Sequence, residues 1–203
     1  MPRGRPKIQR LMGVHMEQWK QDLNDLIRQP PGRDVKGVVQ RIMRSKLDDR
    51  STALTCAAFA EIGLAAGIAM VLQPDRDQVI DWFWKPVGKH GRGKYGSFDK
   101  KISAAFDLDL MGEDTRHNLE IVRRVRNAFA HSMADVRFTT PAIKAACELI
   151  NSPSHLPKEK VRSRKSRCRF AYCQVCDQVF RIFLGGAALK WITGAKPQQR
   201  LLP

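Results

Sequence analysis

The sequence predicts an all-α protein, a multi-helix bundle built around one long apolar helix. Apolar residues recur at three- and four-residue steps, most clearly at Leu119, Val122, Val125 and Phe129. No segment of any length alternates between apolar and polar residues as a half-buried strand does. Residues 50–72 are apolar on nearly all sides, which is typical of a central helix. Hydrophobic residues make up 43% of the 203, which is enough for one well-cored domain with extensions.

Prolines and capping residues mark the elements of the first half of the chain. Pro30 and Pro31 end an amphipathic helix, because proline cannot continue one. Asp34 is a suitable N-cap for a short helix, and Asp48 with Asp49 precedes the long apolar one. A short aromatic helix follows. The expected helices are residues 14–28, 34–43, 50–72 and 75–84.

The second half begins with a glycine-rich basic loop over residues 85–96. Ser97 is the expected N-cap of the next helix, and Leu110 to Gly112 form a turn. Thr140 and Pro141 are a strong helix start, with a capping hydroxyl and proline in the first helical position. The expected helices are residues 98–106, 113–132, 141–150 and 170–192.

These elements suggest a chain of five parts. A basic arm is followed by N-terminal helices, a central helical domain, a basic linker containing prolines, and a last helix with a tail. The corresponding ranges are residues 1–13, 14–45, 46–152, 153–169 and 170–203.

The basic residues indicate a polyanionic partner. The formal net charge is +16, and the cations gather in the first ten residues, in the loop at 85–94 and in the run 158–169. Nucleic acid is the expected partner, while an anionic membrane surface, an acidic protein or a merely solvated tail is the alternative. The candidate contact residues are Arg3, Arg5, Lys7, Arg92, Lys94, Arg162, Arg164, Lys165 and Arg167.

The first residues, Pro2-Arg3-Gly4-Arg5-Pro6-Lys7, resemble an AT-hook, an arm that lies in the minor groove of A·T-rich DNA. Glycine lets the backbone lie deep in the groove, and the flanking arginines follow its negative potential. The alternative is a basic N-terminus that only adds solubility. We therefore expect DNA, rather than RNA, as the nucleic acid.

Residues 126–131, Arg-Asn-Ala-Phe-Ala-His, are candidates for phosphodiester chemistry. Asn127 and His131 are four residues apart and so share one helix face, with Arg126 beside them. An arginine can hold a phosphate with two hydrogen bonds, and a histidine can move a proton near neutral pH. The alternative is structural: the same three residues can cap a helix and hold a bundle or a dimer together.

Glu61 is the one acid within the apolar helix, and a buried carboxylate needs a partner. Arg126 or Arg50 could provide it, and structural pairing is the expected role.

The spacing of Cys168, Cys173 and Cys176 suggests zinc only weakly, because no fourth ligand is in place. We expect core cysteines with free thiols, no metal and no cofactor.

Four blocks of sequence follow one another in a set order: residues 48–54, residues 96–102 with 106–108, residues 119–131 and residues 138–143. In this order they resemble the mannitol operon repressor family of bacterial proteins, over residues 46–152, about half of the chain. The resemblance implies a helical fold and a role in transcriptional regulation. The Arg126-Asn127-x-x-x-His131 pattern also resembles the signature of HEPN domains, small helical and often dimeric domains that include metal-independent ribonucleases.

We therefore expect a cytoplasmic transcriptional regulator that binds nucleic acid through its basic extensions, and a homodimer. One alternative is a HEPN-type ribonuclease of the toxin or defence kind, which would use Arg126, Asn127 and His131 as its site. A second is a non-catalytic dimer that binds another protein. No membrane span is expected, because Glu61 lies near the middle of the apolar stretch and would be costly at the bilayer centre.

Overall fold

The computed structural model describes residues 47–74, 80–84, 93–151 and 164–193, together with residues 41, 42, 45 and 78. In the last helix, the side chains are described for residues 167–183. Contacts divide the chain into two units, residues 1–36 and 37–203, and every described residue belongs to the second. The expected basic arm and the helix at 14–28 lie outside the described residues, as does nearly all of the helix expected at 34–43.

The prediction of an all-α fold is confirmed for the described residues. They contain no strand beyond a single bridged residue, Met111. One short element, which forms the end of the helix expected at 75–84, is π-helical rather than α-helical. The elements are α3 (Asp49–Leu72), η1 (Ile80–Trp84), α5 (Phe98–Asp107), α6 (Glu113–His131), α7 (Pro141–Glu148) and α8 (Arg164–Thr193).

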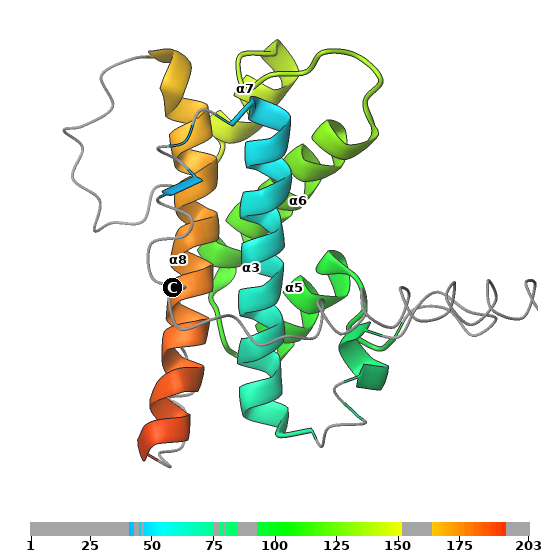
Figure 1. The fold of residues 1–203 in the computed structure, drawn as a ribbon, viewed down its shortest axis with the longest axis vertical. Coiled ribbons are helices and arrows are strands. Elements are labelled where there is room, and N and C mark those ends of the chain that lie inside the picture. The colour runs from blue at the N-terminus through cyan, green and yellow to red at the C-terminus, as the bar shows by residue number, and fades with distance from the viewer. Residues whose placement is uncertain are drawn as a thin grey trace, which may run out of the picture. The chain divides into compact units, whose positions relative to one another are not determined.

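Helix α3 is the centre of the bundle. It packs against α5, α6 and α8, and α8 runs beside it along its length (Figure 1). Burial on several sides accounts for the apolar composition that the sequence shows all around this helix. Among the described helices, α3 is the one long and apolar enough to cross a membrane, and half of the qualifying stretch is buried against its neighbours.

The contact between α3 and α8 depends on small residues. A Cβ atom at Gly63 would lie 2.9 Å from the Cα atom of Phe180, and one at Gly67 would meet the ring of Phe183. The backbones can therefore approach closely only because both positions lack a side chain. Tyr172 of α8 is fully buried in the same contact, and its hydroxyl donates to the carbonyl oxygen of Ala53 at 2.9 Å.

The structure confirms two of the predicted N-caps, Asp48 and Ser97. It differs from the prediction at Thr140, which does not cap its helix, and at the start of α8. Asp48 accepts from the amide of Ser51, and Ser97 accepts from that of Lys100. Thr140 does precede Pro141 at the start of α7, but its hydroxyl accepts from the amide of Arg137 instead of capping the helix. Helix α8 begins at Arg164, so residues 164–169, expected to be linker, form its first turns.

We expect the Gly63→Ala substitution to destabilise the protein by about 1–3 kcal/mol, because the new methyl group would meet backbone atoms of α8. Alanine favours an isolated helix by about 1 kcal/mol over glycine, so a loss shows that packing decides the sign. Urea unfolding followed by circular dichroism measures it. An unchanged or higher midpoint would show that α8 is not held this closely.

Candidate functional site

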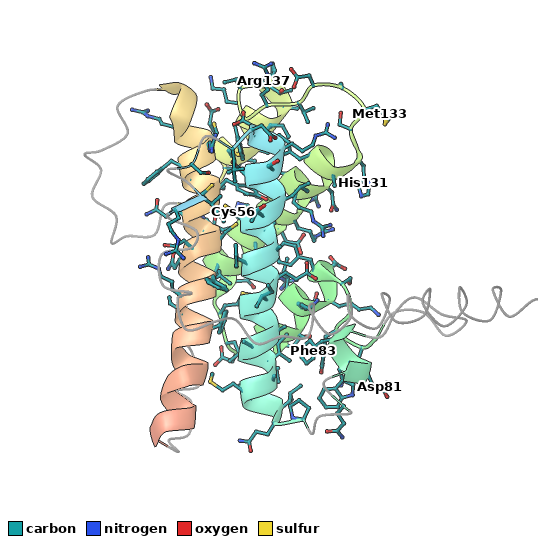
Figure 2. The ribbon with its side chains drawn as sticks, in the orientation of Figure 1. Cys56, Asp81, Phe83, His131, Met133 and Arg137 are labelled. Carbon is teal, nitrogen blue, oxygen red and sulfur yellow. The ribbon has the colours of Figure 1, made fainter. Side chains whose placement is uncertain are left out.

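The three motif residues lie in the last turns of α6. The helix ends because Ser132 has an extended backbone, with its amide donating to the carbonyl of Ala128. Arg126 and Asn127 are partly buried, whereas His131, the last helical residue, is exposed on the outer side of α6 (Figure 2). Among the described residues, His131 has no hydrogen bond or ion pair with the other two. The structure therefore places the three residues on one helix without joining the imidazole to the guanidinium.

Arg126 is held by two neighbours. Its Nη1 donates to Oδ1 of Asn127 at 3.0 Å, and its Nη2 lies 3.9 Å from Oε2 of Glu61. The side chain is 36% exposed. Asn127, one of the three candidate residues, therefore orients the guanidinium through its side-chain oxygen. Arg126 thus has a fixed position with one side open to solvent.

Glu61 pairs mainly with a residue that the sequence analysis missed. Its Oε1 accepts from Nζ of Lys101 at 2.7 Å, and only 3% of the lysine side chain is exposed. The expected pairing with Arg126 is present at the longer distance. The expected alternative, pairing with Arg50, is wrong. The sequence did carry a signal for Lys101, because it lies on the apolar face of its helix beside Ile102.

Arg50 has a different role, at the start of α3. Its Nη2 donates to the carbonyl oxygens of Ser132 at 2.9 Å and Ala134 at 3.1 Å. The neighbouring Asp49 accepts from the amide of Phe138 at 2.9 Å. The first turn of α3 therefore fixes the segment that directly follows His131.

A cavity of about 470 Å³ opens beside this segment. It contains three arginines and three aspartates, and two of the pairs are close, Arg137 with Asp135 at 2.7 Å and Arg169 with Asp49 at 3.3 Å. Neither Arg126 nor His131 lines it. No local sequence pattern indicates this cavity, because its walls come from three distant segments. The lining residues are Leu47, Asp48, Asp49, Arg50, Asp135, Val136, Arg137 and Arg169.

The positive charge is segregated along the chain. Residues 47–151 contain 14 basic and 14 acidic residues, so their net charge is zero. Residues 1–46 carry +7 and residues 152–203 carry +9, which together make up the whole excess of +16. The total charge of residues 47–151 therefore does not attract a polyanion.

The candidate nucleic-acid contacts are only partly described. Lys94 is exposed, with its ammonium 5.5 Å and 5.0 Å from the ring centres of Trp82 and Tyr95. Arg167 is exposed on α8. Arg164 and Lys165 lie in the first turn of α8, with side chains outside the described ones. The remaining candidates lie outside the described residues: Arg3, Arg5, Lys7, Arg92 and Arg162.

The cysteines do not form a reactive or metal-binding site in the described part of the chain. All five are free and buried, and Sγ of Cys56 lies 3.5 Å from Sγ of Cys173 in the interior. Burial raises the pKa of the Cys147 thiol to about 12, so it stays protonated at neutral pH. No group of three or more His, Cys, Asp or Glu side chains among the described residues is placed to hold a metal ion.

Comparison of the chain with models of protein families, with curated proteins and with solved structures gave no match. The resemblance to mannitol operon repressors and to HEPN domains therefore rests on the quoted residues.

We expect the Arg50→Met substitution to loosen the segment after His131, because two carbonyl oxygens lose their charged donor. The expected loss is about 1 kcal/mol, since water can replace part of the interaction at these positions. Amide hydrogen exchange of residues 132–138 measures the local effect. Arg124→Met, at an exposed position of α6, is the control, and equal exchange in the two variants would contradict the assigned role.

Proposed function

We propose that the protein binds nucleic acid through its basic flanks and acts as a transcriptional regulator of the mannitol-repressor type. The observation that carries the proposal is the segregation of charge. An electrically neutral stretch, residues 47–151, lies between flanks that hold the entire excess of +16. Flanks of this composition neutralise phosphates and release condensed counterions, which is the main source of affinity in sequence-independent binding.

The start of α8 supports this reading. Its first two turns contain Arg164, Lys165, Arg167 and Arg169, and the first turn contains no acid. Cations at a helix N-terminus are unfavourable, because the helix dipole is positive there. Of the two cations whose side chains the structure describes, Arg167 and Arg169, only Arg169 has a carboxylate partner, Asp49. A polyanion at this position would offset both the mutual repulsion of the cations and their conflict with the dipole.

DNA is the preferred nucleic acid in this proposal, because the arm at residues 2–7 has the composition of a minor-groove binder. A homodimer is part of the same proposal and follows from the resemblance to HEPN domains, and a cytoplasmic location is proposed from the free cysteines.

We expect the affinity for a mixed-sequence DNA duplex to fall steeply with salt. Replacing Arg162, Arg164, Lys165 and Arg167 together by glutamine should reduce the slope of log affinity against log salt by roughly three to four, because each lost phosphate contact removes about 0.9. Fluorescence anisotropy at several salt concentrations measures the slope.

The matched control replaces four exposed cations within residues 47–151 by glutamine: Lys100, Arg124, Arg137 and Lys144. This control lowers the net charge by the same four units as the flank variant, and it should leave most of the slope of log affinity against log salt unchanged. A slope that both sets reduce equally, or binding that ignores salt, would contradict the placement of the interface on the flanks.

A second candidate function, a metal-independent ribonuclease, is supported by the exposure of the motif. His131 is exposed and Arg126 has one open side on the same helix. In RNA the 2′-hydroxyl can attack the neighbouring phosphate. His131 would take or return the proton, and Arg126 would stabilise charge developing on the phosphate oxygens.

If this second function is present, the protein cleaves single-stranded RNA in EDTA, and His131→Ala lowers the rate at least about 100-fold. His117→Ala is the control, since His117 is also exposed on α6, with its Nε2 3.2 Å from the carbonyl oxygen of Leu149. Gel analysis of labelled RNA gives the rates. Intact RNA with all three proteins would contradict a catalytic role for Arg126 and His131, and leave a DNA-binding protein or a protein-binding dimer.

A further inference from the structure

Lys101 is an unusual core residue. It lies on α5 and is 2% exposed, on the buried face of the helix that also includes Phe98, Ile102 and Ala105. Burying an ammonium group is costly unless a carboxylate pairs with it. Glu61 of α3 provides that partner at 2.7 Å. The pair places an ammonium and a carboxylate group together inside the bundle, with the carboxylate also close to Arg126 of α6.

Glu61 lies between two cations, Lys101 and Arg126, and is closer to Lys101. Its Oε1 is in hydrogen-bond contact with Lys101, while its Oε2 is 3.9 Å from Nη2 of Arg126, beyond hydrogen-bond distance. The closer pair is also the more buried one, where charges interact more strongly. Of its two described partners, Glu61 therefore interacts more strongly with Lys101, and the formal charges of the three side chains sum to +1.

Arg126 differs in this respect from its neighbours on α6. Arg123 contacts two carboxylates, Glu120 at 2.8 Å and Asp99 at 3.4 Å. Arg124 is exposed and has no described partner that fixes it. Arg126 combines a guanidinium held by the neutral amide of Asn127 at 3.0 Å with a long ion pair, because its one described carboxylate partner, Glu61, lies 3.9 Å away and contacts Lys101 at 2.7 Å.

We propose that Lys101, by neutralising Glu61, leaves the charge of Arg126 available to bind a phosphodiester group of nucleic acid. The proposal rests on the proposed function, which makes nucleic acid the ligand. A planar guanidinium held in place can donate two parallel hydrogen bonds to phosphate oxygens. Lys101 and Glu61 are positioning residues: they set the orientation and the net charge at Arg126 without touching the phosphate.

The test uses the charge of the group as its variable. Glu61→Gln raises it to +2, Lys101→Met lowers it to zero, and the double variant restores +1. The affinity for a short single-stranded oligonucleotide should follow this order. Glu61→Gln should bind roughly three- to tenfold tighter, Lys101→Met should bind weaker by a similar factor, and the double variant should lie near the parent.

The full-length proteins are titrated against the same sequence as DNA and as 2′-O-methyl RNA, which cannot be cleaved through its 2′-oxygen. Lys100→Met, on the same helix but exposed, is the control for a lost lysine charge and should change the affinity little. In an Arg126→Gln background, the differences between the Glu61 and Lys101 variants should vanish. Circular dichroism establishes that each variant is folded, and Glu61→Gln alone tests the sign if Lys101→Met does not fold.

A purely structural role predicts a different result, in which both single variants bind more weakly and the double variant is no better. That outcome would overturn the inference, as would differences that persist without Arg126. If the parent binds both oligonucleotides but the affinities of the variants do not follow the expected order, only this inference fails. If the parent binds neither, the proposed function fails with it.

Discussion

The close contact between α3 and α8 is the constraint on which the rest of the structure depends. Gly63 and Gly67 remove the side chains that would separate the two backbones, and Phe180 and Phe183 pack into the space. Because α8 comes so near, Tyr172 can reach the carbonyl of Ala53 and the far side of α3 is left for α5 and α6. The small-residue face thus decides which helix covers which side of the centre.

This arrangement also determines where charge can sit inside the bundle. Glu61 is on the part of α3 that meets α5 and α6, so its partners come from those two helices, as Lys101 and Arg126. Arg50, on the same helix but three turns earlier, is at the end where the chain leaves α6, and it binds carbonyl oxygens there. One helix therefore orients the motif arginine at its middle and fixes the segment after His131 at its start.

The sequence was sufficient for the elements whose signals are local. Asp48 and Ser97 mark helix starts because an N-cap acts within one turn, and the periodic apolar residues of 119–129 give α6 directly. The start of α8 at Arg164 was missed because a cationic first turn conflicts with the helix dipole and has the composition of a linker. Contacts with α3 and α7 outweigh that conflict, and they are not visible in the local sequence.

The candidate site shows the same division between local and distant causes. The joint placement of Arg126 and Asn127 follows from helix geometry, whereas the choice of Lys101 over Arg50 as partner of Glu61 depends on how three helices meet. The cavity beside Arg50 could not be predicted, since it needs residues 47–50, 135–137 and 169 at one place.

In the function we propose, the neutral stretch at residues 47–151 and the basic flanks suit different parts of binding to a polyanion. The flanks would carry the long-range attraction, which salt screens and which does not depend on a fixed geometry. A held and partly exposed guanidinium such as Arg126 acts at short range, where orientation matters and screening is weaker. A large net charge in residues 47–151 would attract phosphates to many positions and lose that distinction. Because these residues are neutral in total, a held guanidinium such as Arg126, whose ion pair with Glu61 is long at 3.9 Å, could define a position for one phosphate.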